Sequence, residues 1–154
     1  MLRIGVISDT HGLLRPEALE FLAGSDFIVH GGDIGNADIL ARLAAIAPLT
    51  VVRGNNDKGG WAADVPANAL LDVGGVRLYA LHDIAHLDAA ALPAGVKVVV
   101  YGHSHKPLAQ QRGPVLYLNP GSAGPRRFSL PVTAAELLVD AGQVRANIVS
   151  LIRS

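Results

Sequence analysis

The sequence predicts an α/β protein built from two β-sheets with helices on their outer faces. In residues 2–53, short apolar strands alternate with helical segments, which is typical of a parallel sheet with right-handed crossovers. The last third of the chain is rich in strands instead. We therefore expect one mostly parallel sheet from the first half and one mostly antiparallel sheet from the second half.

The elements of the first half have clear start and stop signals. Pro16 suits the first turn of a helix, and Asn36 is a suitable N-cap for a second helix, which Pro48 ends. Residues 54–66 are rich in Gly, Asn, Asp and Ala and predict a loop near the carboxyl edge of the sheet. We expect strands at residues 2–8, 27–30 and 49–53, and helices at residues 15–22 and 37–47.

The second half is predicted to contain mostly strands. Gly74-Gly75 is the signal of a two-residue hairpin between two apolar strands. No linker or repeat interrupts the chain, so we expect a single domain that spans residues 1–154. The expected elements are strands at residues 69–73, 76–82, 96–101, 107–112, 115–119, 132–139 and 144–152, and a brief helix at residues 87–92.

Composition excludes several classes of function. The 154 residues are 50% hydrophobic, and 13 basic side chains match 13 acidic ones, so the chain lacks the charge excess of a dedicated nucleic-acid or membrane-surface binder. It has no cysteine and therefore no thiolate metal site, disulfide or thiol nucleophile. No apolar run approaches the length of a membrane span, and we expect a cytoplasmic protein.

Metal-ligating side chains stand where five apolar strands end. The clearest case is Gly102-His103-Ser104-His105, which follows an apolar run that is expected to be buried on both faces. Ligands in open α/β sheets bind beyond the carboxyl ends of the strands, so we expect these side chains to converge. The seven side chains are Asp9, His11, Asp33, Asn55, His82, His103 and His105.

These side chains offer only oxygen and imidazole nitrogen, which favours divalent first-row metals over a structural zinc site. Seven ligands exceed the needs of one ion, so two ions that share a carboxylate fit better. Two divalent ions, two carboxylates and a bridging hydroxide leave about one positive charge, which suits a phosphodiester monoanion. We expect manganese, with nickel, iron, cobalt or zinc as alternatives.

The motifs Asp9-x-His11, Gly32-Asp33, Gly54-Asn55-x-Asp57, His82 and Gly102-His103-x-His105 together resemble those of the calcineurin-like metallophosphoesterases. Asn119-Pro120-Gly121-Ser122 further resembles the small bacterial and archaeal phosphodiesterase branch of that superfamily. The resemblance implies a four-layer α-β-β-α sandwich of two mixed sheets flanked by helices. It also implies that a hydroxide bridging two metals attacks small phosphodiesters.

The resemblance distributes roles over the motif residues. The first metal would be held by Asp9, His11, Asp33 and His105. Asp33 would bridge, and Asn55, His82 and His103 would complete the second metal site. The catalytic roles would fall on Asp33, Asn55, Asn56 and His103.

Two positions depart from the family pattern. Asn56 stands where many members carry a histidine that protonates the leaving group, and an amide cannot supply that proton. We therefore expect modest turnover and a preference for diesters with acidic leaving groups, with Asn56 bonded to a phosphate oxygen. Asp83 follows His82 where glycine is typical of the branch, and it affects the second metal unless its side chain points away.

For the other polar residues, a structural role is weighed against a role in the site. Asp57 is expected either to orient a ligand or to cap the following loop, and His30 is expected to be a hydrogen-bonded core residue. We expect Trp61 to fill a groove under its loop, with stacking on a substrate ring as the alternative. His86 is expected at a solvated helix start, and Asn119 and Ser122 in a tight turn beside the metals. Three basic residues are expected near the mouth of the site, where they either steer a phosphate or belong to a solvated loop; they are Lys58, Arg126 and Arg127.

Two other functions remain open. The retromer's small scaffold subunit resembles this fold and branch, so a non-catalytic protein-interaction scaffold is one alternative. A phosphomonoesterase is the other, whereas polymer nucleic acid is not an expected substrate. The partner we expect is a small phosphate ester, and the alternating apolar residues near the carboxyl terminus allow a homo-oligomer.

Overall fold

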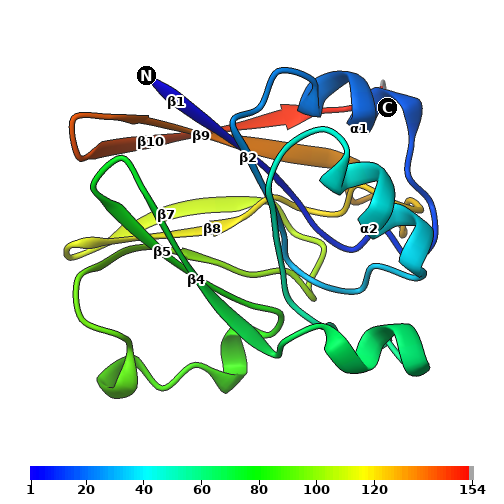
Figure 1. Cartoon of the computed structure of the whole chain (residues 1–154), viewed down its shortest axis with the longest axis horizontal. Helices are drawn as coiled ribbons and strands as arrows, with labels where there is room; N and C mark the ends of the chain where they lie inside the picture. The colour runs from blue at the N-terminus through cyan, green and yellow to red at the C-terminus, as the bar shows by residue number, and fades with distance from the viewer. Residues whose placement is uncertain (153–154) are drawn as a thin grey trace.

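The computed structural model describes residues 1–152 and contains two five-stranded sheets that face each other (Figure 1). In sheet order, the first consists of β10 (Gln143–Ser150), β9 (Thr133–Asp140), β1 (Leu2–Ile7), β2 (Phe27–His30) and β3 (Leu49–Val51). The second consists of β4 (Asn68–Val73), β5 (Val76–Leu81), β6 (Val96–Val100), β8 (Val115–Asn119) and β7 (Leu108–Arg112). Residues 153–154, the end of the predicted domain, lie outside the described part.

Both sheets are mixed, which confirms the predicted fold class. The finer expectation of a mostly parallel first-half sheet and a mostly antiparallel second-half sheet is wrong. β9 pairs antiparallel with β1, and β10 with β9, so the last two strands join the sheet of the first three. In the second sheet, β6 pairs parallel with both β5 and β8. The local pattern of a strand does not specify such long-range partners.

Two helices cover the outer face of the first sheet (Figure 1). They are α1 (Pro16–Leu22) and α2 (Ala37–Ala44), and α2 ends three residues before the predicted position. The Asn36 side chain accepts a hydrogen bond from the Ile39 N–H at 3.1 Å, as expected of an N-cap. Leu22 and Leu43 are fully buried and pack in the same cluster as Ile28 of β2.

The outer face of the second sheet has a thinner cover. The predicted helix at residues 87–92 is instead one 3₁₀ turn, η3 (Ala89–Ala91), and another 3₁₀ turn, η2 (Ile84–His86), precedes it. The side chains of Asp83 and Asp88 each accept a backbone N–H at 3.0 Å and so begin a short turn rather than a continuous helix. A third turn, η1 (Gly60–Asp64), carries Trp61, which packs against the first sheet's outer cluster; this confirms its predicted packing role.

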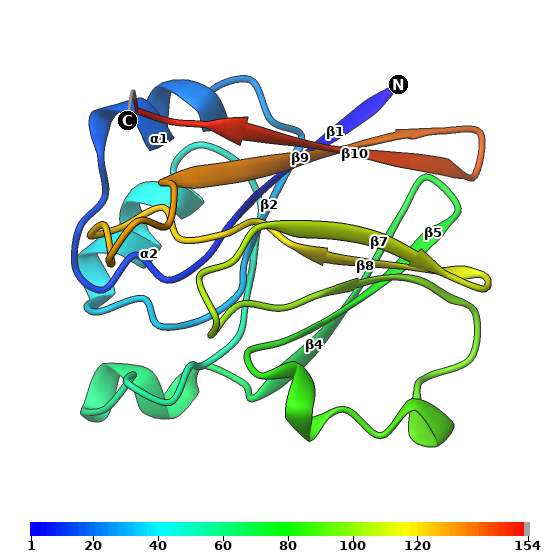
Figure 2. The ribbon, with the colours of Figure 1, turned by 180° about the vertical axis from the view of Figure 1, so that it is seen from behind.

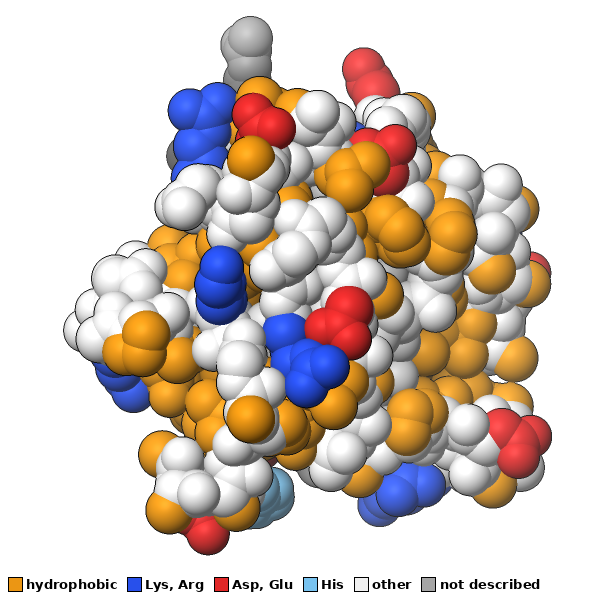
Figure 3. All heavy atoms as spheres, turned by 60° about the vertical axis from the view of Figure 1, so that its left-hand side comes forward, with side chains coloured by type: hydrophobic (Ala, Val, Ile, Leu, Met, Phe, Trp, Pro, Cys, Tyr) orange, Lys and Arg blue, Asp and Glu red, His pale blue; other side chains and the backbone are white. Residues whose placement is uncertain are grey.

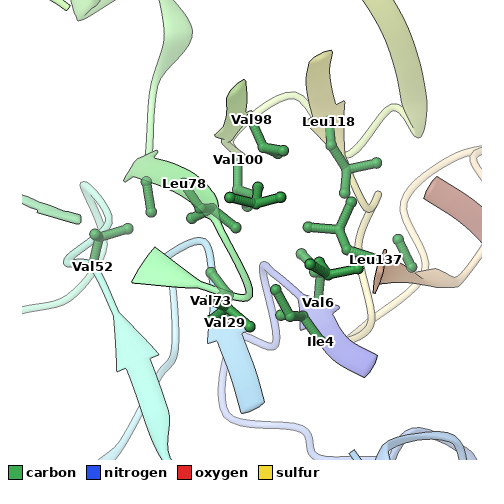
Figure 4. Close-up of a cluster of buried hydrophobic side chains, with 14 residues drawn as sticks. Ile4, Val6, Val29, Val52, Val73, Leu78, Val98, Val100, Leu118 and Leu137 are labelled. Carbon is green, nitrogen blue, oxygen red and sulfur yellow. The ribbon is translucent and has the colours of Figure 1, made fainter. Parts of the chain in front are cut away.

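The main core lies between the two sheets (Figure 4). Residues alternate along each strand between this core and the outer faces. Burying one Val, Leu or Ile side chain contributes about 1.5–3 kcal/mol, so this core stabilises the packing of the two sheets against each other. The labelled core residues are Ile4, Val6, Val29, Val52, Val73, Leu78, Val98, Val100, Leu118 and Leu137.

The hairpin turns and the long loops lie at opposite ends of the sandwich (Figure 2). The predicted β4–β5 hairpin is confirmed, with positive φ angles of 56° at Gly74 and 83° at Gly75. Figure 3 looks toward the side of the hairpin turns, where acidic, basic and hydrophobic side chains are interspersed and histidine is nearly absent. None of the helices within residues 1–152 is long and apolar enough to cross a bilayer.

Candidate metal centre

The seven predicted ligands come together at the end of the sandwich opposite the hairpin turns. Asp9 and His11 follow β1, Asp33 follows β2 and Asn55 follows β3, all in the first sheet. The second sheet supplies the three remaining side chains after its parallel strands. These are His82 after β5, and His103 and His105 after β6.

Asp9, His11 and His105 form one group whose ligand atoms all lie within 4.8 Å of one another. The Nε2 atoms of His11 and His105 are 3.3 Å apart. Asp9 Oδ1 lies 3.4 Å from His105 Nε2 and 3.8 Å from His11 Nε2. Three donor atoms thus face a common point, as a transition-metal site requires.

Asp33, His82 and His103 form a second group within the same 4.8 Å limit. Asn55 joins them, because its Oδ1 lies 3.0 Å from His82 Nε2 and 3.2 Å from His103 Nδ1. Asp33 Oδ2 is 3.2 Å from His82 Nε2 and 3.7 Å from His11 Nε2. Asp33 therefore lies between the two groups.

One buried, unpartnered oxygen of the first group, Asp9 Oδ1, fits a bound cation. Within residues 1–152, Asp9 Oδ1 and His105 Nδ1 are the buried side-chain nitrogen or oxygen atoms without a hydrogen-bond partner. Asp9 is fully buried, and an unpaired buried carboxylate oxygen costs free energy unless a positive charge compensates it. The donor atoms and the orphaned oxygen together fit divalent metal ions.

The local electrostatics keep Asp33 ionised. Burial alone raises the pKa of Asp33, but the hydrogen bond from His82, the Asn56 N–H and the charges of His82 and His11 lower the pKa to about 2. Burial alone lowers the pKa of His82, but Asp33 and the Gly31 carbonyl outweigh burial and raise it. Asp33 is therefore a carboxylate at neutral pH and is available to a cation.

The hydrogen bond to Gly31 also orients the His82 ring. His82 Nδ1 lies 2.7 Å from the Gly31 carbonyl oxygen, which can only accept, so Nδ1 carries a proton. Nε2 then faces Asn55 and Asp33. Metal-binding histidines commonly donate their second ring N–H to a carbonyl or carboxylate in this way.

The backbone at the site is unusual. Among the described residues, seven non-glycine residues have positive φ, and five of them are candidate ligands. Left-handed conformations cost free energy in residues with a Cβ atom and cluster at functional sites. No pattern in the amino-acid sequence predicts this strain. The five are Asp9, His11, Asp33, His103 and His105, with φ between 46° and 72°.

Asp57 holds the loop that carries Asp33. Its buried carboxylate accepts backbone N–H groups of Asp33 at 2.9 Å, Ile34 at 2.8 Å, Gly35 at 3.2 Å and Gly54 at 2.8 Å. Of the two predicted alternatives, the one that orients a ligand agrees with these bonds, although Asp57 acts on the backbone of Asp33 and not on a histidine ring.

Two glycines let the strand ends approach each other. A Cβ atom at Gly54 would overlap the backbone and carboxylate of Asp33. One at Gly102 would overlap the Ser8 hydroxyl and lie 2.6 Å from Asp9 Oδ2. The Gly54-Asn55 and Gly102-His103 pairs therefore combine a close approach with a ligand.

Ser8 is a supporting residue that the sequence did not single out. Its hydroxyl is fully buried and donates to Asp9 Oδ2 at 2.8 Å, so the second oxygen of Asp9 is satisfied. The His103 N–H donates to the same oxygen at 3.2 Å. Its position in the sequence could have indicated this role, because Ser8 is a hydroxyl residue directly before the first aspartate, at the end of an apolar strand.

His30 is confirmed as a hydrogen-bonded core residue. The Gly32 N–H donates to His30 Nδ1 at 3.0 Å, and His30 Nε2 lies 3.0 Å from the Thr10 hydroxyl, which donates to the Ile34 carbonyl. Burial lowers the pKa of His30 to about 4, so the ring is neutral near pH 7. It ties the end of β1 to the end of β2 and is not a ligand.

Asn119 and Ser122 stabilise the turn beside the site, as expected. Asn119 Nδ2 donates to the Gly102 carbonyl and to the Ser104 hydroxyl, each at 3.1 Å. The Ser122 hydroxyl donates to the Asp9 carbonyl at 3.0 Å. Both residues therefore fix the backbone of ligand-bearing segments.

Comparison with known proteins assigns the family. The model of the calcineurin-like phosphoesterase superfamily domain matches residues 2–142. The chain belongs to the calcineurin-like phosphoesterase superfamily.

Relatives of this chain share most of its length. A probable metallophosphoesterase of Methanothermobacter thermautotrophicus is 32% identical over 158 residues, which cover 95% of this chain and 91% of the relative. Phosphodiesterase YfcE of Escherichia coli K12 is 33% identical over 150 residues, which cover 79% of each chain. The crystal structure of Vps29 from Entamoeba histolytica with Zn²⁺ superposes with a TM-score of 0.73 at 21% identity and covers 98% of this chain and 100% of that chain. The likeness to Vps29 shows the fold alone.

The two departures from the family pattern have defined positions in the structure. The Asn56 side-chain amide donates to Asp33 Oδ2 at 3.3 Å, and its backbone N–H donates to Asp33 Oδ1 at 2.9 Å. Asp83 does not point away from the site, because its Oδ2 lies 3.8 Å from His103 Nε2. The same oxygen is 4.0 Å from His86 Nε2.

The remaining predicted residues are exposed. His86 is exposed on η2, as predicted, and also lines a cavity beside the site. Lys58, Arg126 and Arg127 are exposed. Burial lowers the pKa of His11, and the positive charge of Arg127 lowers it further. The negative charges of Asp33 and Asp9 raise this pKa but do not outweigh burial. Arg127 is thus close enough to affect the site electrostatically.

Proposed function

We propose that this phosphoesterase is a dinuclear metal-dependent phosphodiesterase that hydrolyses small phosphodiesters. The observation that carries the proposal is the pair of adjoining ligand groups, each with three donor atoms within 4.8 Å, with Asp33 between them. The relative named as a phosphodiesterase, YfcE, supports the choice of reaction.

In this proposal the first ion is held by Asp9, His11, His105 and Asp33, and the second by Asp33, Asn55, His82 and His103. When bound, two divalent ions lower the pKa of a water molecule and neutralise negative charge on the phosphoryl oxygens. We propose manganese, because oxygen-rich sites with imidazole suit it, with nickel, iron, cobalt and zinc as the alternatives.

The protein's own groups position the substrate. The Asn56 amide has two hydrogens, of which one is used by Asp33, so the other is free for a phosphate oxygen. No N–H of an amide can protonate a leaving alkoxide at neutral pH. Turnover therefore depends on the acidity of the leaving group, and an aryl diester is a better substrate than an alkyl diester.

The alternatives predict different behaviour. A phosphomonoesterase would keep the metals and prefer a dianionic substrate. A protein-interaction scaffold has support from the fold of Vps29 alone, and it does not require donor atoms that converge in two groups.

Three further expectations stay predictions. They are the single domain over residues 1–154, the cytoplasmic location and a homo-oligomer through the edge strand β10.

A hydrolysis assay tests the proposal. The protein is stripped with chelator and assayed on bis(p-nitrophenyl) phosphate and p-nitrophenyl phosphate with and without manganese. Asp33→Asn should lower diesterase activity at least about 100-fold, since the ionised carboxylate between the two groups is lost. Asp38→Asn, which changes an exposed carboxylate on α2, is the matched control and should retain activity.

Two results would contradict the phosphodiesterase. Faster hydrolysis of the monoester would favour the phosphomonoesterase. A folded protein with no turnover under manganese, nickel, cobalt or zinc would favour the scaffold.

A further inference from the structure

A cavity of about 300 Å³ opens beside the second ligand group. Asn55 and His82 belong to both the ligand group and the cavity wall, so a phosphate held at the metals would have a substituent at the cavity mouth. The other lining residues come from the loop after β3, from the β4–β5 pair and from η2. Those that bear on a ligand are Arg53, Asn68, Tyr79, Leu81 and Asp83.

The floor of the cavity is an apolar and aromatic surface on the outer face of the second sheet. Leu81 pairs across the ladder with Asn68, and Tyr79 pairs with Leu70, so all four side chains share one face. Tyr79 is half-buried, and Leu70 is 49% exposed next to it. The cavity wall thus combines an aromatic ring with apolar carbon, the kind of surface against which a planar aromatic group packs.

Polar groups of the cavity have capacity for a ligand. Within residues 1–152, the Arg53 guanidinium and the side-chain amide of Asn68 have no hydrogen-bond or ion-pair partner. The backbone N–H of Arg53 donates to the Pro66 carbonyl at 2.7 Å, which fixes the backbone at this position. Asp83 supplies a negative charge that offsets Arg53. A neutral group with hydrogen-bond donors and acceptors therefore suits the cavity better than a second phosphate.

We infer that this cavity binds a planar, nucleoside-sized substituent of the phosphate, with Tyr79 as the aromatic wall and Asn68 and Arg53 as hydrogen-bonding groups. The inference rests on the proposed function for the placement of the phosphate. The volume of about 300 Å³ lies at the low end of small-ligand pockets, which span about 300–1,000 Å³, and matches a group the size of one nucleoside. The substrate class is then a nucleoside phosphodiester.

Binding measurements test the cavity separately from catalysis. Dissociation constants of adenosine 5′-monophosphate and methyl phosphate are measured by calorimetry on the manganese-loaded protein. The nucleotide should bind at least about tenfold more tightly, because a stacked base contributes that much in comparable sites. Tyr79→Leu and Asn68→Ala should each weaken nucleotide binding and leave methyl phosphate binding unchanged. Gln110→Ala on the distant edge strand β7 is the control and should change neither constant.

Equal affinities for the two ligands, or a nucleotide preference that survives Tyr79→Leu and Asn68→Ala, would overturn the inference. Hydrolysis of bis(p-nitrophenyl) phosphate is measured on the same samples. Active protein without a nucleotide preference would contradict the cavity alone. Inactive protein with a preference that Tyr79→Leu abolishes would support the cavity and contradict the phosphodiesterase.

Discussion

At the residue scale, the candidate ligands depend on side chains that bind no substrate. Asp57 accepts four backbone N–H groups and thereby fixes the loop that carries Asp33, and Ser8 satisfies the second oxygen of Asp9. Hydrogen bonds to a charged group contribute about 1.5–3 kcal/mol each, which is comparable to the cost of one left-handed residue. These bonds therefore offset the backbone strain at Asp33 and Asp9.

Asp83 is predicted to support the second metal ion. Its carboxylate lies 3.8 Å from His103 Nε2, while His103 Nδ1 faces Asn55. Carboxylate partners of metal-binding histidines typically change affinity by 10–100-fold, so Asp83→Asn should weaken the second manganese ion about tenfold and leave the first unchanged. Titration calorimetry of the chelator-treated protein resolves the two steps.

Asp88→Asn is a closely matched control for this substitution. Asp88 caps η3 through the Ala90 N–H at 3.0 Å, just as Asp83 caps η2 through the Ala85 N–H at 3.0 Å. Asparagine retains an oxygen that can accept the capping N–H, so Asp88→Asn removes the charge of a cap without affecting a histidine contact. Equal effects of the two substitutions on metal affinity would show that Asp83 does not act through His103.

The ligand types and their places at strand ends were predictable, because a histidine or aspartate directly after a buried strand gains nothing from the core. The orientation of Asp83 toward His103 could not be predicted, since it depends on the turn that η2 makes after β5. Nor could the positive φ angles, because aspartate and histidine have no strong sequence signal for that conformation.

At the element scale, one ion pair links β1 to the strand that the sequence did not place beside it. Arg3 Nε donates to Glu136 Oε2 of β9 at 2.6 Å, and its guanidinium also donates to Ser25 Oγ at 2.9 Å and to the Phe21 carbonyl at 2.7 Å. The pair thus joins β9 to β1 and to the end of α1. Strand boundaries were predictable from composition, but this partner was not.

This ion pair predicts a pH-dependent contribution to stability. The hydrogen bond from Arg3 lowers the pKa of Glu136 below the ordinary 4.5. The contribution is therefore complete above the unfolded-state pKa and is lost as the pH falls through the folded-state pKa. Thermal unfolding of metal-free protein from about pH 7 to about pH 3 should show a steeper acid loss for the wild type than for Glu136→Gln.

Glu17→Gln, on the exposed face of α1, controls for the loss of a carboxylate and should leave the acid slope unchanged. Parallel unfolding curves for the wild type and Glu136→Gln over this pH range would contradict the proposed linkage.

At the scale of the whole molecule, each ligand group combines the two sheets. Asp9 and His11 come from the first sheet and His105 from the second, whereas Asp33 comes from the first and His82 and His103 from the second. The buried core between the sheets fixes their separation (Figure 4). Metal ions bound there would stabilise the packing of the sheets, because they bind the folded state only.

The measurement that tests the dinuclear centre most directly is anomalous diffraction from crystals grown with manganese. Two anomalous peaks should lie between the sheets, one against Asp9, His11 and His105 and one against His82 and His103, with Asp33 between them. A single peak, or peaks that do not contact these residues, would contradict the dinuclear centre.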